Sequence, residues 1–121
     1  MSNKGWIGVD LDGTLAFYED WSGVDHIGEP IKPMLDRVKR WIAKGYHVKI
    51  FTARYSEAND KEYVTKRIQD WLIEHGLPPL EVTATKDYKM VQLWDDRCVQ
   101  VVPNKGEPVG IINMRKNELD D

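Results

Sequence analysis

The stretch Trp6-Ile7-Gly8-Val9-Asp10-Leu11-Asp12-Gly13-Thr14 decides how the rest of the chain is interpreted. Its first four residues form an apolar run that predicts a short buried strand. Because side chains two apart on an extended chain point to the same face, Asp10 and Asp12 both project from the carboxyl end of this strand unless the chain bends. Burying like charges this close together is costly without a cation or hydrogen-bond donors. We interpret the pair as a metal site or as a nucleophile with its acid–base partner, although Asp-Gly is also ordinary turn chemistry.

Bulk properties indicate one soluble domain that spans residues 1–121. A chain of 121 residues and 14.0 kDa is long enough for one core. The net charge of −3 gives no basic footprint for nucleic acid. A single cysteine, Cys98, excludes an intramolecular disulfide and fits the cytoplasm. No apolar run approaches the ~20 residues that span a bilayer, and the start lacks the shape of a signal peptide, so we expect no membrane contact. Whether the chain forms a homo-oligomer stays open.

Hydrophobic periodicity predicts alternating strands and helices. Residues 15–30 mix aromatic, acidic and glycine residues without a clear period, and we expect them to form a flap after the first strand. Helical spacing follows over 31–42, and a second apolar helical stripe is preceded by Asn59 and Glu62, which resemble a capping box. Strands are expected over 46–51, 80–84, 90–94 and 98–102, with an edge strand over 109–113 and a frayed tail over 116–121.

This alternation is typical of an α/β domain with a mostly parallel sheet. Four of the predicted strands end in residues that can carry chemistry. In open α/β sheets the ligand site lies beyond the carboxyl ends of the strands, so the topology collects these residues at one edge. They are Asp10 and Asp12, Thr52, Lys86, and Asp95 with Asp96.

The residue types at this edge favour Mg²⁺ and a phosphoryl group. Several carboxylates with no supporting cluster of His and Cys are hard oxygen ligands, which suit Mg²⁺ better than zinc. The Thr52 hydroxyl and the Lys86 ammonium suit phosphoryl oxygens. A metal-bound carboxylate that faces a phosphate can act as a nucleophile, and a carboxylate two residues on can exchange the protons.

The chain resembles the haloacid dehalogenase-like superfamily of aspartate-nucleophile phosphatases. Four motifs occur in the family's order: D-x-D-G-T at Asp10–Thr14, an apolar strand that ends at Thr52, a lone lysine at Lys86, and the acidic pair Asp95-Asp96. Together they span most of the chain. The first and last motifs are specific as a pair, whereas the middle two are weak alone.

The resemblance implies a role for each matched residue. Asp10 is the expected nucleophile, which forms an aspartyl-phosphate, and Asp12 the expected general acid and base. Mg²⁺ is expected on an Asp10 oxygen, the backbone carbonyl of Asp12, Asp95, and Asp96 either directly or through water. Thr52 and Lys86 are expected to hold the phosphoryl oxygens. Lys89 is the rival of Lys86, which we prefer because it ends a predicted strand.

The resemblance also implies a Rossmann-like, three-layer fold without the cap domain of larger members, because only the flap separates Thr14 from the first helix. The expected activity is phosphomonoester hydrolysis of an unidentified phosphorylated small molecule; a nucleotide or a nucleic-acid end phosphate is the alternative substrate. A phosphoaspartate receiver domain is the rival class, but its acidic, Thr and Lys positions come in a different order. Arg54, Arg97 and Trp21 are candidate substrate contacts, and each arginine could instead pair with a carboxylate.

Overall fold

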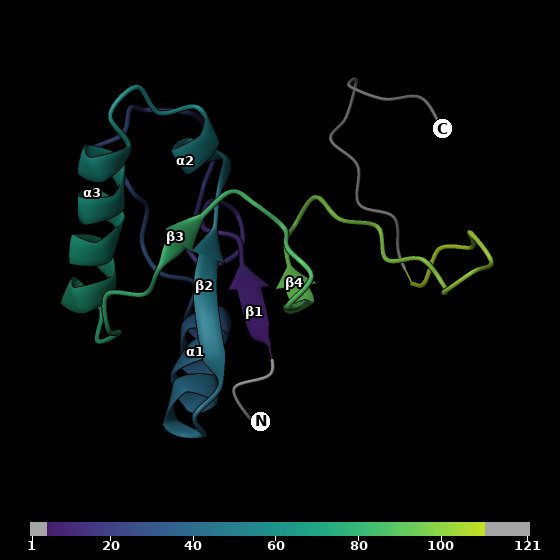
Figure 1. Ribbon diagram of the computed structural model, residues 1–121. Helices are drawn as coiled ribbons and strands as arrows, with labels where there is room; N and C mark the ends of the chain where they lie inside the picture. Colours follow the sequence, from purple (N-terminus) through teal and green to yellow (C-terminus); the bar gives the residue numbers. More distant parts are fainter. Residues whose placement is uncertain (1–4, 111–121) are drawn as a thin grey trace.

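The computed structural model describes residues 5–110, and its centre is a four-stranded, fully parallel sheet (Figure 1). The strand order is β3-β2-β1-β4, so the strand that carries the acidic motif lies inside the sheet. The expected α/β class is therefore confirmed. The strands are β1 (Trp6–Val9), β2 (His47–Phe51), β3 (Val82–Thr83) and β4 (Met90–Trp94).

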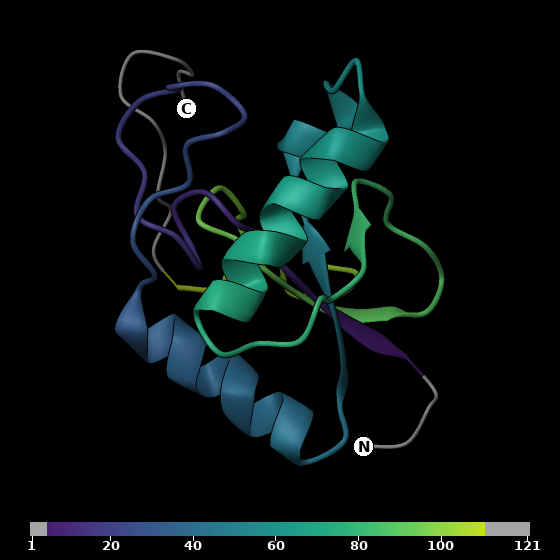
Figure 2. The ribbon, with the colours of Figure 1, turned by 90° about the vertical axis from the view of Figure 1, so that its left-hand side faces the viewer.

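Helices α1 (Lys32–Ala43) and α3 (Lys61–Glu74) connect β1 to β2 and β2 to β3. Two right-handed crossovers that move along the sheet in one direction place their helices on the same face. Figures 1 and 2 agree with this, because the connection from β3 to β4 passes on the other side of the sheet. The described residues thus give two layers, and a third layer stays a prediction.

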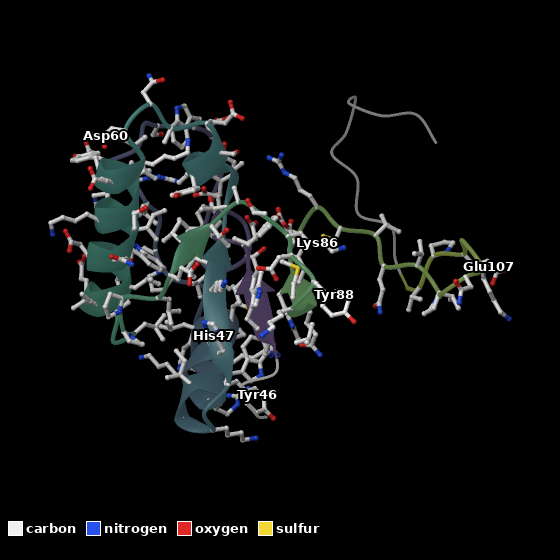
Figure 3. The ribbon with its side chains drawn as sticks, viewed as in Figure 1. Tyr46, His47, Asp60, Lys86, Tyr88 and Glu107 are labelled. Atoms are coloured by element: carbon white, nitrogen blue, oxygen red, sulfur yellow. The ribbon has the colours of Figure 1, made fainter. Side chains whose placement is uncertain are left out.

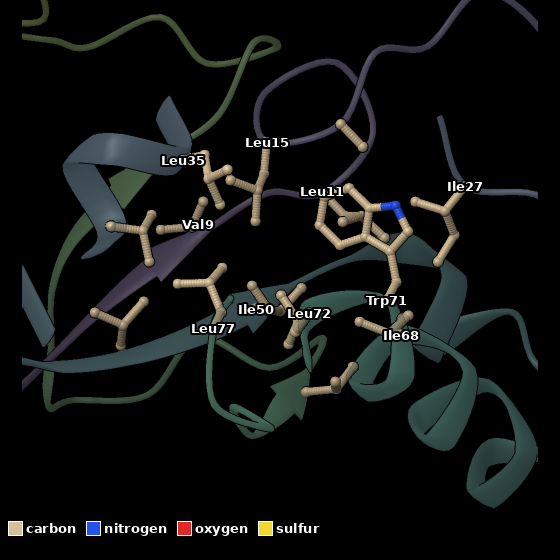
Figure 4. Packing of buried hydrophobic residues seen from close by; sticks show 14 of the residues in the cluster. Val9, Leu11, Leu15, Ile27, Leu35, Ile50, Ile68, Trp71, Leu72 and Leu77 are labelled. Atoms are coloured by element: carbon tan, nitrogen blue, oxygen red, sulfur yellow. The ribbon is translucent and has the colours of Figure 1, made fainter. Parts of the chain in front are cut away.

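The core lies between this helical layer and the sheet (Figure 4). Val9, Leu11 and Leu15 are fully buried and pack in one cluster with side chains of both helices. Burying three such side chains contributes about 2 kcal/mol each. The acidic motif therefore sits on a backbone whose alternate residues are fixed in the core. The remaining large members of the cluster include Ile27, Leu35, Ile50, Ile68, Trp71, Leu72 and Leu77.

The flap, residues 15–30, leaves the sheet and returns to it without forming a helix or a strand. Its base is closed by hydrogen bonds from the Phe17 amide to the Glu29 carbonyl and from the Ile31 amide to the Leu15 carbonyl, both 2.8 Å long. The two arms approach so closely that a Cβ on Gly28 would lie 2.0 Å from the Phe17 carbonyl oxygen. Only glycine fits at position 28, and the two ends of the flap are held together at its base.

Two local expectations are wrong, and one short helix was missed. The N-cap of α3 is Asp60, whose carboxylate accepts from the Tyr63 amide, and not Asn59. A short helix, α2 (Ala53–Ser56), begins directly after β2 and was not expected. The predicted strand over 98–102 does not join the sheet, because the chain turns back through a left-handed Asn104 and pairs Val101 with Pro108 in a single bridge.

The expected edge strand over 109–113 is absent at 109–110, and its remainder lies outside the described residues, as does the expected tail over 116–121. Residues 98–110 run away from the sheet in Figure 1. Among residues 5–110, no helix has the length and apolar character that crossing a membrane requires.

Candidate active site

Asp10 leaves the sheet beside the acidic pair that follows β4. Its amide donates to the Trp94 carbonyl at 2.9 Å, so the parallel pairing of β1 with β4 brings Asp10 level with Asp95. The chain then turns through Gly13, whose φ is 91°. A Cβ at this position would lie 2.5 Å from Oδ2 of Asp96. Gly13 is thus needed both for the turn and for the close approach of the acidic pair.

Three carboxylates meet at this point. One oxygen of each of Asp10, Asp95 and Asp96 lies within 4.8 Å of the others. Asp10 and Asp95 are half-buried, whereas Asp96 is exposed. This donor set consists of hard oxygen atoms only, which suit Mg²⁺ better than zinc. The fold therefore brings together the three carboxylates that were expected to bind the metal.

The cluster disfavours the ionised state of Asp10. Burial, the charge of Asp95, and a hydrogen bond and charge from Asp96 together raise the pKa of Asp10 to about 8, while the Thr14 hydroxyl, 3.3 Å from Oδ2, acts in the opposite direction. A carboxyl group in such surroundings retains its proton at neutral pH unless positive charge is supplied. A divalent cation among the three carboxylates would supply that charge.

Asp12 has a different partner. Its carboxylate accepts two hydrogen bonds from Arg54, from Nε to Oδ2 at 2.7 Å and from Nη2 to Oδ1 at 2.9 Å. The Arg54 side chain is only 5% exposed, so this is a nearly buried, bidentate ion pair. Of the two alternatives for Arg54, pairing with a carboxylate is the one that the structure shows. The role of Asp12 as a metal ligand through its backbone carbonyl stays a prediction.

Thr52 ends β2 and caps α2. Its side-chain oxygen accepts from the Arg54 amide at 3.1 Å, and its own amide donates to the Thr83 carbonyl at 2.9 Å. A hydroxyl that accepts a hydrogen bond still has its own hydrogen to donate. Thr52 is 2% exposed and lines the same cavity as Asp10, and binding of a phosphoryl oxygen by its hydroxyl stays a prediction.

Lys86 does not end a strand, since β3 stops at Thr83, and our reason for preferring it was therefore wrong. It lies on the connection from β3 to β4, at the other end of the sheet from Tyr46 and His47 in Figure 3. Its charge lowers the pKa of the Cys98 thiol, although burial and the three clustered aspartates raise that pKa overall. The charge of Lys86 and the charges of Asp10, Asp95 and Asp96 therefore act on the same thiol, that of Cys98.

Lys89 lies at the end of the sheet opposite to the carboxylates. Its carbonyl oxygen accepts from the Trp6 amide at 2.9 Å, which places its backbone beside the amino end of β1. The carboxylates gather at the carboxyl end of that strand. Lys86 is therefore preferred over Lys89 because of where its backbone lies relative to the carboxylates, and not because it ends a strand.

A cavity of about 650 Å³ opens above the carboxylates. Its floor includes Asp10, Thr52 and Asp95, and the flap contributes Tyr18 and Trp21 to its wall. The Arg54 guanidinium lies over the Trp21 ring at 4.8 Å. All three candidate substrate contacts, Trp21, Arg54 and Arg97, line this cavity. Contact of any of them with a substrate stays a prediction. Tyr18 was missed because the irregular flap gives no period from which its direction could be inferred.

Comparison with known proteins supports the fold alone. No family model matches the sequence, and no curated protein matches it. Among solved structures, a conserved protein from Bacteroides thetaiotaomicron superimposes with a TM-score of 0.57 over 84% of each chain, at 20% sequence identity. This similarity is one of architecture, and its description names no activity.

Proposed function

We propose that the chain is a Mg²⁺-dependent phosphomonoester hydrolase of the haloacid dehalogenase-like superfamily, with an aspartyl-phosphate intermediate on Asp10. The observation that carries the proposal is the convergence of Asp10, Asp95 and Asp96 within 4.8 Å, with Asp10 and Asp95 lining a cavity that Thr52 also lines. The order of these residues along the chain differs from that of a receiver domain, and oxygen donors alone favour Mg²⁺ over zinc.

The proposed reaction has two steps. Before the first step Asp12 takes up a proton from solvent and releases one of its two bonds to Arg54. A carboxylate oxygen of Asp10 then forms a bond to phosphorus while the ester P–O bond breaks, and Asp12 gives that proton to the leaving oxygen. Asp12 then takes a proton from water as the water oxygen bonds to phosphorus, and the bond from phosphorus to Asp10 breaks. Inorganic phosphate leaves and both carboxyl groups return to their first states.

The remaining residues orient the phosphoryl group and balance its charge. Thr52 would donate its hydroxyl hydrogen, and Lys86 would supply a positive charge from the connection between β3 and β4. Mg²⁺, when bound by Asp10, Asp95 and Asp96, would neutralise the carboxylates and the phosphoryl oxygens. We propose that the flap covers the site in place of the cap domain of larger members. The three-layer fold is also part of this proposal.

Metal dependence is the first test. With a panel of phosphomonoesters that includes sugar phosphates, nucleotides and an aryl phosphate, we expect hydrolysis in Mg²⁺, loss of hydrolysis in excess chelator, and recovery when Mg²⁺ is returned. The physical reason is that three carboxylates around a phosphoryl group repel it without a cation. Full activity in chelator would contradict the assignment of the cluster.

The two lysines provide a matched pair of variants. We expect Lys86→Met to lower kcat/KM by about 10²-fold, because a cation beside the transferring phosphoryl group is lost. Lys89→Met should stay within about twofold of the parent, because its backbone lies at the far end of the sheet. Steady-state kinetics on the best substrate of the panel decides between them, and a crippled Lys89→Met beside a normal Lys86→Met would reverse the assignment.

A further inference from the structure

One guanidinium group holds both the flap and the expected acid–base residue. Besides the two bonds to Asp12, Arg54 donates from Nη2 to the His26 carbonyl at 2.8 Å and from Nη1 to the Val24 carbonyl at 3.3 Å. Both carbonyls belong to the flap, whereas Arg54 itself belongs to α2. Two segments of the site therefore share one buried cation.

We infer that Arg54 is a positioning residue that makes the orientation of the Asp12 carboxylate depend on the seating of the flap. This inference rests on the proposed function for the catalytic meaning of Asp12, but the coupling itself does not require that function. The acid–base residue would be held correctly only while the flap carbonyls hold the other side of the guanidinium.

Burial makes the coupling strong. With 5% of its side chain exposed, Arg54 has little access to water that could replace a lost partner. The guanidinium is planar, so the two bonds to Asp12 fix the plane of that carboxylate, and the bonds to the flap fix the plane of the guanidinium. A shift of Val24 and His26 would therefore rotate or release Asp12.

The flap has a second anchor that does not involve the site. Arg67 on α3 donates from Nε to the Asp25 carbonyl at 3.1 Å, and the Tyr63 hydroxyl donates to the Asp25 carboxylate. Arg67 thus binds a flap carbonyl between the two that Arg54 binds, but no described contact joins it to Asp12. Arg54 and Arg67 form a natural pair of test and control.

Leaving-group dependence is the catalytic readout. We expect Arg54→Gln and Arg54→Lys to lower kcat by about 10²-fold for alkyl phosphates, which need an acid, and by less than about fivefold for an aryl phosphate with a good leaving group, with KM nearly unchanged. Arg67→Gln should retain the wild-type ratio between the two substrates, because Tyr63 still binds Asp25 and Arg54 still binds the Val24 and His26 carbonyls. Arg54→Lys keeps the positive charge but loses the planar, two-pronged guanidinium. A loss of kcat in this variant would therefore show that the geometry of the guanidinium, and not its charge, positions Asp12.

Three kinetic outcomes would overturn the inference. An increase in KM with an equal loss for both leaving groups would make Arg54 a substrate contact. Full activity of Arg54→Lys would reduce its role to charge. A change in leaving-group dependence in Arg67→Gln that equals the change in Arg54→Gln would show that flap anchoring alone, without the bond to Asp12, explains the effect.

A second readout requires no activity. Because coupling between two contacts of one group is reciprocal, Asp12→Asn should increase amide hydrogen exchange in the flap over 22–28 by at least about tenfold, although the substituted side chain belongs to another segment. Unchanged exchange there would refute the coupling. If the wild-type protein hydrolysed nothing in the panel, the proposed function would fail while this measurement still decided the inference.

Discussion

Replacing Asp10 by Asn is expected to reduce phosphomonoester hydrolysis by at least about 10⁴-fold, because an amide is a poor nucleophile and a weaker ligand for a hard cation. The fold should survive, since the two side chains have nearly the same shape. The initial rate with the best substrate of the panel in Mg²⁺ measures the loss. A variant with more than about a tenth of the parent's rate would remove Asp10 from the role of nucleophile.

The same substitution should stabilise the protein when metal is absent. The pKa of Asp10 is raised from 3.8 to about 8 in the folded chain, so the folded state holds this proton more tightly than the unfolded state does. The resulting stability is fully present below pH 4 and is lost as the pH rises through 8. The amide of the variant does not titrate, so linkage predicts that Asp10→Asn is more stable than the parent by about 5 kcal/mol at pH 8 and by about 1 kcal/mol at pH 4.5.

Urea unfolding in chelator at these two pH values checks that expectation. Asp70→Asn is the matched control, because Asp70 is an exposed partner of Lys66 on α3 and lies outside the cluster. Its effect on the free energy of unfolding should be within about 0.5 kcal/mol at both pH values. A difference between Asp10→Asn and the parent that is the same at pH 4.5 and pH 8 would contradict the assigned cause.

Asp12→Asn should have the second-largest effect, and its effect on stability is opposite in sign to that of Asp10→Asn. Loss of acid and base assistance should slow hydrolysis by ~10²–10⁴-fold, with the larger loss for poor leaving groups. Loss of the charged partner of a nearly buried Arg54 should lower the free energy of unfolding by about 1–3 kcal/mol.

Steady-state kinetics with alkyl and aryl phosphates, together with urea unfolding, measures both effects. Asp20→Asn, at an exposed position of the flap, is a suitable control for the substitution. Rates that are unchanged for good and poor leaving groups alike would remove Asp12 from proton transfer. Unchanged stability would show that the ion pair with Arg54 contributes nothing net to the fold.

The parts of the fold that depend on regular periodicity could be predicted from the sequence. The alternation of apolar runs and helical stripes predicts β1, α1, β2, α3 and β4, and the convergence of carboxylates follows because parallel strands place their carboxyl ends together. That is why Asp10, Asp95 and Asp96 could be placed in one cluster although the first lies far from the other two in the chain.

The parts that depend on tertiary partners could not be predicted. The alternation over 98–102 is typical of a strand, but whether such a segment joins the sheet depends on which neighbour it meets, and here it pairs with Pro108 instead. Likewise, the position of Arg54 shortly after a strand gives no sign of its direction. Its bonds to Val24 and His26 exist only because the flap folds over α2.

The central claim is that the phosphoryl group passes through Asp10, and its most direct test is to stop turnover with acid and find the phosphorylated residue. The protein would be mixed with substrate in Mg²⁺, quenched within milliseconds, digested with an acid-stable protease and examined by mass spectrometry. We expect a phosphoryl group on Asp10 in Asp12→Asn, where its hydrolysis is slowed, and none in Asp10→Asn. A phosphoryl group on Asp95 or Asp96 that persists in Asp10→Asn would contradict the account.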